Sequence, residues 1–252
     1  MIKYGIKLWS INHALFPEAV AAVKNGQADF VEVYLVPAKV DFKALEVLKE
    51  VEVTIHAPYF EHGFNIHQLN NEMISLFKSE VIPAADLLSS HQIVVHAGVG
   101  SENQIFAENV KKIHDNRIII ENKPKIGMHE VLCYGYSLEQ LRFIHAECGY
   151  QICFDFSHAI ISAVQQGVAY KEFIRDAVSI LKPSYFHISD AHQKSGDDEH
   201  LSLGDGDYDF GYIKKLIESA AVEQEVHVVF ETPKEGAGLE NDLKNIQYFK
   251  NL

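Results

Sequence analysis

Eight apolar runs alternate with segments of helical periodicity along the 252 residues, and this alternation predicts an α/β fold, a single (β/α)8 TIM barrel. The runs are nearly continuous in apolar residues, as expected for parallel strands that are covered on both faces. No low-complexity linker or internal repeat interrupts the pattern, so we expect residues 1–252 to form one domain. The alternative is an open doubly wound sheet, which ordinarily has fewer strands and carries a G-x-G-x-x-G motif after the first strand. This chain lacks that motif.

The strands are predicted first, from the apolar runs. They cover residues 3–9, 29–36, 51–56, 92–98, 117–122, 150–156, 184–189 and 225–231. Among the helices between them, Ser137 and Gln140 have the spacing of a capping box. Pro83 is expected to kink or split the helix after the third strand, because proline cannot donate a backbone hydrogen bond. The last helix is predicted for residues 239–251.

The composition excludes several classes of protein. The formal net charge of −13 argues against nonspecific binding of nucleic acid, which depends on many Lys and Arg residues. No apolar stretch approaches the roughly 20 residues that span a bilayer, and no signal segment is evident, so we expect a cytoplasmic protein without a membrane partner. The three cysteines show no C-x-x-C spacing, which argues against a disulfide framework or a cysteine zinc site. No protein partner can be read from the sequence.

Metal-competent side chains lie at the ends of six consecutive predicted strands, from the third to the eighth. These residues are His56, His96, Glu121, Asp155, His187 and Glu231. The carboxyl ends of barrel strands form one mouth, where reacting groups are found. One such residue alone would be interpreted as a solvated loop residue. Six strand ends that all carry His, Asp or Glu are not expected by chance, because other polar residues suit a solvated strand end equally well. Nitrogen and oxygen donors without thiolates favour zinc or another divalent transition metal over calcium.

Two loops add further candidate metal ligands. His158 follows Asp155 by three residues, within one turn of the predicted junction between strand and helix. The long loop after the seventh strand contains Asp198 and His200, which can bind one ion because alternate residues of an extended segment face the same side. Loops of this length in a compact barrel tend to be functional. His192 in the same loop has no partner at a suitable spacing, and we expect it to be solvated.

An ordered set of motifs resembles the endonuclease IV group (family 2 apurinic/apyrimidinic endonucleases) of the xylose isomerase-like barrel superfamily. The motifs are H-x-x-Y, V-V-H-A-G, I-I-E-N, D-x-x-H, F-H-I-S-D, D-E-H-L-x-L-G-D-G and F-E-T-P, which cover the chain from the third strand to the eighth. Each motif is weak alone, but their order and spacing together are specific. The resemblance implies a centre of up to three zinc ions that activates a water for attack on a phosphoester, with abasic-site DNA as the substrate.

The resemblance also implies an assignment of ligands. The first ion would take His56, His96 and Glu121, the second Glu121, Asp155, His187 and Glu231, and the third His158, Asp198 and His200. Glu121 would therefore bridge two ions. Glu121, Glu231 and Tyr59 are the candidate catalytic residues, where Tyr59 of the H-x-x-Y motif would press into the DNA or pack over the metal site.

Two alternatives remain open at this point. Sugar or sugar-phosphate isomerases and epimerases on the same scaffold need one divalent ion, Mn²⁺ or Mg²⁺, and two carboxylates, for which Glu121, Asp155, His187 and Glu231 would suffice. A barrel that binds metal without catalysis is the other. In the endonuclease group the loop after the second strand carries basic and tryptophan residues, whereas residues 34–42 here contain one lysine and no tryptophan. A small phosphorylated sugar therefore suits this acidic chain better than a DNA duplex.

Overall fold

The eight strands form a closed parallel barrel in which each strand pairs with the next and the eighth pairs with the first. The structure is a computed structural model that describes residues 1–252. The strands are β1 (Ile2–Trp9), β2 (Phe30–Tyr34), β3 (Val53–His56), β4 (Ile93–His96), β5 (Ile118–Glu121), β6 (Gln151–Asp155), β7 (Tyr185–Ile188) and β8 (Val226–Phe230). The TIM-barrel prediction is confirmed, and the open doubly wound alternative is wrong.

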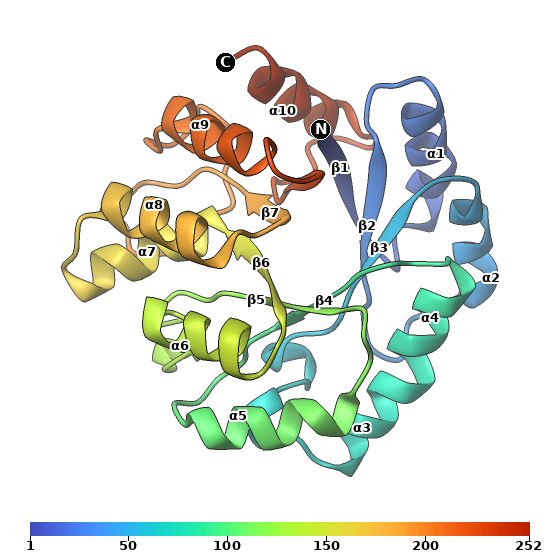
Figure 1. Cartoon of the computed structure of the whole chain (residues 1–252). Coiled ribbons are helices and arrows are strands. Elements are labelled where there is room, and N and C mark those ends of the chain that lie inside the picture. Colours follow the sequence, from blue (N-terminus) through green and yellow to red (C-terminus); the bar gives the residue numbers. More distant parts are fainter.

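The helices form the outer ring of the barrel, where the colours of Figure 1 run in chain order from blue to red. They are α1 (Phe16–Lys24), α2 (Phe42–Leu45), α3 (Asn71–Leu76), α4 (Ile82–Leu87), α5 (Asn103–Val110), α6 (Leu138–Arg142), α7 (Phe156–Gln166), α8 (Tyr170–Leu181), α9 (Phe210–Ala220) and α10 (Glu240–Lys250). Two helices, α7 and α8, lie between β6 and β7. None of the helices has the length and apolar character needed to cross a membrane.

Local sequence signals account for two helix boundaries. The segment after β3 is split as expected: a π-helical turn over Phe77–Val81 separates α3 from α4, and Pro83 is the second residue of α4. Proline is tolerated there because the first N–H groups of a helix have no partner within the helix. Ser137 caps α6, since its Oγ accepts the N–H of Gln140 at 3.2 Å.

An apolar layer fills the barrel interior below the site. Its members are Phe30, Val94, Ile119, Cys153, Tyr185 and Val229, which form a buried cluster separate from the larger core between the strands and the helices. Gly5 of β1 completes this layer without a side chain, because a Cβ there would lie 2.5 Å from the Phe30 ring. Side chains two residues apart on a strand share a face. The residues two positions after this apolar layer therefore also point inward, and they form the next layer toward the carboxyl ends of the strands.

Candidate metal centre

The layer above the apolar cluster consists entirely of polar side chains, seven from within the strands and one, Glu231, directly after β8. In order from β1 to β8 they are Lys7, Glu32, His56, His96, Glu121, Asp155, His187 and Glu231. Six of them are the residues predicted from the sequence. β7 extends one residue beyond His187, and β8 ends one residue before Glu231, so these two lie near the strand ends instead of at them.

Lys7 and Glu32 were not predicted as site residues. The first two strands were predicted to end at residues 9 and 36, and only the last residue of each predicted strand was considered as a ligand. Inward-facing residues further from the strand end were therefore overlooked. The signal that could have found them is the period of two, which leads from Gly5 to Lys7 and from Phe30 to Glu32.

Glu121 is the central carboxylate of the site. Its Oε2 atom lies 3.1 Å from His56 Nε2 and 3.2 Å from His96 Nε2. Its Oε1 atom lies 3.1 Å from His158 Nδ1, and the side chain is fully buried. Burial by itself would raise the pKa of Glu121, but the neighbouring His96 and His187 outweigh burial and hold this pKa well below its usual range. The carboxylate is therefore ionised and is surrounded by imidazoles.

His187 connects Glu121 to the β8 side of the ring. Its Nδ1 atom lies 2.8 Å from Glu231 Oε1 and 3.5 Å from Glu121 Oε2. Its Nε2 atom lies 2.9 Å from Glu32 Oε2, and the Lys7 ammonium contacts the carboxylates of both Glu32 and Glu231. His187 and Glu32 are fully buried. This half of the site therefore holds opposite charges in contact, with His187 and Glu32 away from water and with Lys7 and Glu231 at the cavity.

Asp155 and His158 lie at the junction of β6 and α7. Asp155 Oδ1 accepts the backbone N–H of His158 at 2.7 Å, so this carboxylate caps α7. The cap sets the direction of the His158 ring, whose Nδ1 lies 2.9 Å from the Asn122 carbonyl oxygen and 3.1 Å from Glu121 Oε1. Burial raises the pKa of Asp155 to about 6. Burial lowers the pKa of His158, but Asp155 and Asp198 outweigh burial and raise it to about 10.

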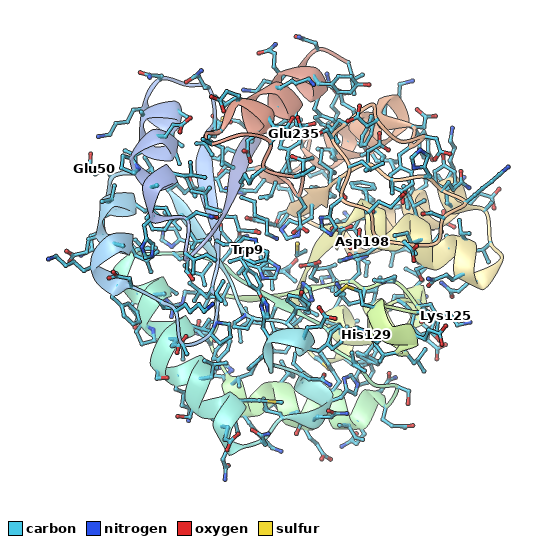
Figure 2. All side chains as sticks on the ribbon, turned by 180° about the vertical axis from the view of Figure 1, so that it is seen from behind. Trp9, Glu50, Lys125, His129, Asp198 and Glu235 are labelled. Atoms are coloured by element: carbon cyan, nitrogen blue, oxygen red, sulfur yellow. The ribbon has the colours of Figure 1, made fainter.

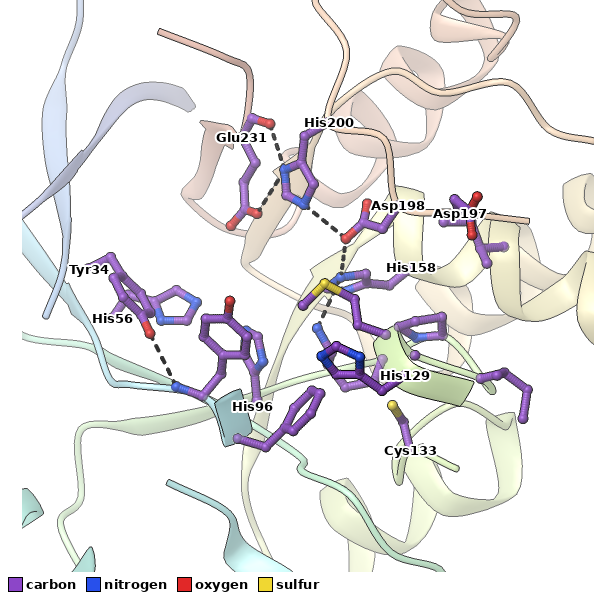
Figure 3. Close-up of a pocket in the computed structure, with 18 of the residues that line it drawn as sticks. Tyr34, His56, His96, His129, Cys133, His158, Asp197, Asp198, His200 and Glu231 are labelled. Carbon is purple, nitrogen blue, oxygen red and sulfur yellow. Dashed lines mark hydrogen bonds and ion pairs between the residues drawn. The ribbon is translucent and has the colours of Figure 1, made fainter. Parts of the chain in front are cut away.

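The loop after β7 brings Asp198 and His200 back to the barrel mouth. Asp198 Oδ2 lies 3.0 Å from His158 Nε2 and 2.9 Å from His200 Nε2. His200 also contacts the backbone oxygen of Glu231 through Nδ1, at 2.8 Å. Figure 3 shows this chain of contacts running from Glu231 through His200 and Asp198 to His158. The structure thus brings the two loop residues to the strand-derived donors, and His192 of the same loop is exposed, as expected.

Asp190 holds this loop in place from its buried position two residues after the end of β7. Its Oδ2 atom accepts the N–H groups of Gly204 and Gly206 at 2.9 Å each, and its Oδ1 atom accepts those of Ala191 at 2.9 Å and Tyr208 at 3.2 Å. Gly206 has no room for a side chain, because a Cβ would lie 2.4 Å from Asp190 Oδ1. No role was predicted for Asp190. Its position at the end of the F-H-I-S-D motif is the signal that could have indicated one.

Aromatic side chains line one wall of the cavity above the site. The Tyr59 ring lies 5.5 Å from the His96 ring and 5.9 Å from the Tyr34 ring, and the Tyr59 hydroxyl donates to Glu61 at 3.0 Å. Burial raises the pKa of Tyr59 to about 12. Trp9 also lines the cavity, and in Figure 2, which shows the molecule from behind Figure 1, it lies near the centre of the barrel. The Tyr59 ring therefore packs beside His96, a candidate metal ligand, and both roles predicted for Tyr59 stay predictions.

Two further contacts shape the rim of the cavity. The Lys123 ammonium lies 3.1 Å from His158 Nε2 and forms no ion pair with a carboxylate. His129, from the loop after β5, contacts Glu61 at 2.8 Å through Nε2, so the loops after β3 and β5 meet at the rim. The cavity between these walls has a volume of about 860 Å³.

The donor set fits divalent transition metal ions. Four groups have ligand atoms that all lie within 4.8 Å of one another: Glu32/His56/His187/Glu231, His56/His96/Glu121, Glu121/Cys153/His187 and Glu121/Asp155/His158. Glu121 Oε1 and His187 Nδ1 are buried, and their close contacts with His158 and Glu231 do not have hydrogen-bond geometry, as expected for donor atoms arranged to face a cation. Burial raises the pKa of Cys153, so its thiol stays neutral. Imidazole and carboxylate donors in this combination are typical of zinc sites.

The fold and these side chains define a TIM barrel whose mouth can hold metal ions. Residues 19–252 match the sequence model of the family described as xylose isomerase-like TIM barrel, and the chain belongs to this family. A search of the curated proteins finds no match.

Solved structures of two kinds of enzyme share the fold. Endonuclease IV from Thermus thermophilus superposes with a TM-score of 0.70 at 21% sequence identity, over 99% of this chain and 98% of that one. The 3-keto-D-glucoside 4-epimerase YcjR from E. coli gives 0.68 at 14% identity, over all of both chains. D-psicose 3-epimerase from Clostridium cellulolyticum gives 0.61 at 13% identity, over 97% of this chain and 89% of that one. These similarities show the fold alone.

Proposed function

We propose that this protein is a multinuclear, zinc-dependent phosphoester hydrolase that resembles endonuclease IV. The supporting observation is that His158 and His200 both contact the same carboxylate oxygen of Asp198, while His158 also contacts Glu121. A sugar epimerase with a single ion has no need of this second group of donors. A hydrolase that holds several ions uses all of them, because the attacking and leaving oxygens of a phosphoester are stabilised by different ions.

The proposed ligand sets follow the three regions of the site. One ion takes His56, His96 and Glu121, a second takes Glu121, Asp155, His187 and Glu231, and a third takes His158, Asp198 and His200. When bound, such ions supply Lewis acidity to the phosphoester and to a nearby water.

Four side chains of the site have roles of their own beside the metal ions. Glu121 and Glu231 stay ionised and fix the spacing of the histidines, since both carboxylates have a pKa well below the usual range: burial would raise it, but Lys7 and His187 outweigh burial at Glu231. The Lys123 ammonium, which lines the cavity and forms no ion pair, binds a phosphate oxygen of the substrate. The Tyr59 ring keeps water away from one side of His96.

A small phosphorylated sugar is the substrate that the cavity favours, with abasic-site DNA as the substrate implied by the resemblance. The volume of about 860 Å³ suits a small molecule. Acidic residues of the rim, Glu130 and Asp197, would repel a DNA backbone, as would the net charge of −13. DNA binding would need a basic surface that residues 34–42 do not supply.

A divalent-metal-dependent sugar isomerase or epimerase is the second candidate. One observation favours it: His187 contacts both Glu121 and Glu231, and His158 contacts both Glu121 and Asp155, so the four residues that a single ion needs are linked by close contacts. Two carboxylates that flank one Mn²⁺ or Mg²⁺ ion can remove and return a proton next to a carbonyl group.

Two assays separate these candidates. The zinc-loaded protein is incubated with a panel of sugar phosphates, with release of phosphate measured, and with an abasic-site duplex, with nicking measured on a gel. The manganese-loaded protein is incubated with keto and aldo sugars in deuterated water, and proton exchange is followed by NMR. Phosphate release or nicking supports the hydrolase. Deuterium incorporation without either product would instead establish the epimerase.

A further inference from the structure

Glu32 is a fully buried carboxylate that belongs to none of the proposed ligand sets, although it lies in one of the four compact groups of donor atoms. It comes from β2 and has three polar partners, namely His187 Nε2 at 2.9 Å, the Tyr185 hydroxyl at 2.8 Å and the Lys7 ammonium at 3.1 Å. An ionised carboxylate in the interior is costly unless it is paired and hydrogen-bonded. Glu32 is both paired and hydrogen-bonded, so the free-energy cost of burying its charge is offset. Its contact with His187 indicates what it does.

His187 presents its two ring nitrogens to different carboxylates. Nε2 faces Glu32 at 2.9 Å, whereas Nδ1 faces Glu231 at 2.8 Å and Glu121 at 3.5 Å. An imidazole that binds a metal does so through one nitrogen, and a partner that accepts the proton of the other nitrogen fixes the tautomer and the ring orientation. Of the two nitrogens, only Nδ1 lies among the proposed ligands.

We propose that Glu32 is a positioning residue that holds a proton on Nε2 of His187 and so directs Nδ1 toward the cation between Glu121 and Glu231. This proposal rests on the proposed metal centre. Lys7 completes the arrangement, because it contacts Glu32 on one side and Glu231 on the other and offsets the extra negative charge that Glu32 adds to the interior.

Any variant that tests Glu32 must also take account of the positive charge of Lys7. Removing Glu32 alone would leave the largely buried Lys7 ammonium with one partner fewer, and such a variant can fail to fold. Both charges are therefore removed together, in Lys7→Met/Glu32→Gln and Lys7→Met/Glu32→Leu. The two double variants have the same net charge and side chains of similar size at position 32. They differ in what position 32 can accept: the glutamine oxygen can still accept the protons of His187 Nε2 and of the Tyr185 hydroxyl, and leucine can accept neither.

The first measurement is the tautomer of His187 in the zinc-loaded protein, by NMR of protein labelled with ¹⁵N-histidine and assigned with a His187→Asn variant. We expect the Nε2–H form in the wild type and in the glutamine double variant, and loss of that single form in the leucine double variant. Tyr185→Phe is the matched control, because it removes another hydrogen bond to the same Glu32 oxygen without touching His187. It should retain the Nε2–H form.

The second measurement is metal affinity by titration with zinc in competition with a chelator. The leucine double variant should lose about 10- to 100-fold in affinity at one ion relative to the glutamine double variant, which is the usual effect of losing such a partner. Equal affinity and an unchanged tautomer in the two double variants would overturn the role of Glu32 while leaving the proposed function intact. Binding of no divalent ion by the wild type would overturn both.

Discussion

The Oδ2 atom of Asp198 lies 3.0 Å from Nε2 of His158, and this contact joins the long loop after β7 to the first turn of α7. Asp198→Asn should remove one bound ion and lower hydrolysis by about 100-fold or more, since loss of a ligand exceeds the effect of losing its outer partner. The checks are metal content and initial rate. Asp205→Asn is the control, because Asp205 is an exposed carboxylate of the same loop. A full metal complement in Asp198→Asn would contradict the third ligand set.

Glu121→Gln should have the largest effect of any single change in the site. This carboxylate contacts His56, His96 and His158, so we expect at least two ions to be lost together and activity to fall by about 100-fold or more. Metal analysis and a rate measurement test this, with the exposed Glu139→Gln on α6 as control. Loss of only one ion would mean that Glu121 does not bridge.

The metal-free protein should become less stable as the pH rises. The pKa of His158 is raised to about 10 in the folded protein, against about 6.5 in an unfolded chain. Because the folded state binds this proton more tightly, the stabilisation is complete below about pH 6.5 and is lost as the pH rises toward about 10. His200, whose pKa is raised to about 9 by Asp198 against the effect of burial, acts in the same direction.

Denaturant unfolding of the metal-free protein at several pH values measures this effect. Zinc affinity should change in the opposite sense and increase over the same range, because the ion competes with these protons for the imidazoles. A metal-free stability that does not vary between about pH 6.5 and 10 would show that His158 is not held as an imidazolium.

Asp190→Ala should loosen the loop that carries Asp198 and His200. Four backbone N–H groups lose their acceptor, so we expect a loss of about 1–3 kcal/mol in the free energy of unfolding and weaker binding of one ion. Denaturant unfolding and zinc titration measure the two effects, with Asp205→Asn again as control. If all ions bound as in the wild type, the loop geometry would not depend on Asp190.

The barrel and most of its mouth were predictable because their signals are local and periodic. His56, His96, Glu121 and Asp155 end their strands, and parallel strands bring their carboxyl ends together wherever the barrel closes. The strand order and the ring of six donors could therefore be predicted without knowing how the loops fold.

The features that were missed depend on depth within a strand or on loop closure. Lys7 and Glu32 lie two residues before the ends of β1 and β2, so their inward direction follows from register and not from position at a terminus. Asp190 acts on backbone N–H groups up to 18 residues further along the chain, and no local pattern indicates such a contact. Tertiary contacts of this kind require the structure.

The metal content of the purified protein tests the central claim most directly. The arrangement of nine donors around Glu121 and Asp198 predicts about three zinc ions per chain, retained on dialysis, in elemental analysis of protein prepared without added metal. A single exchangeable manganese or magnesium ion, or no bound ion, would contradict it.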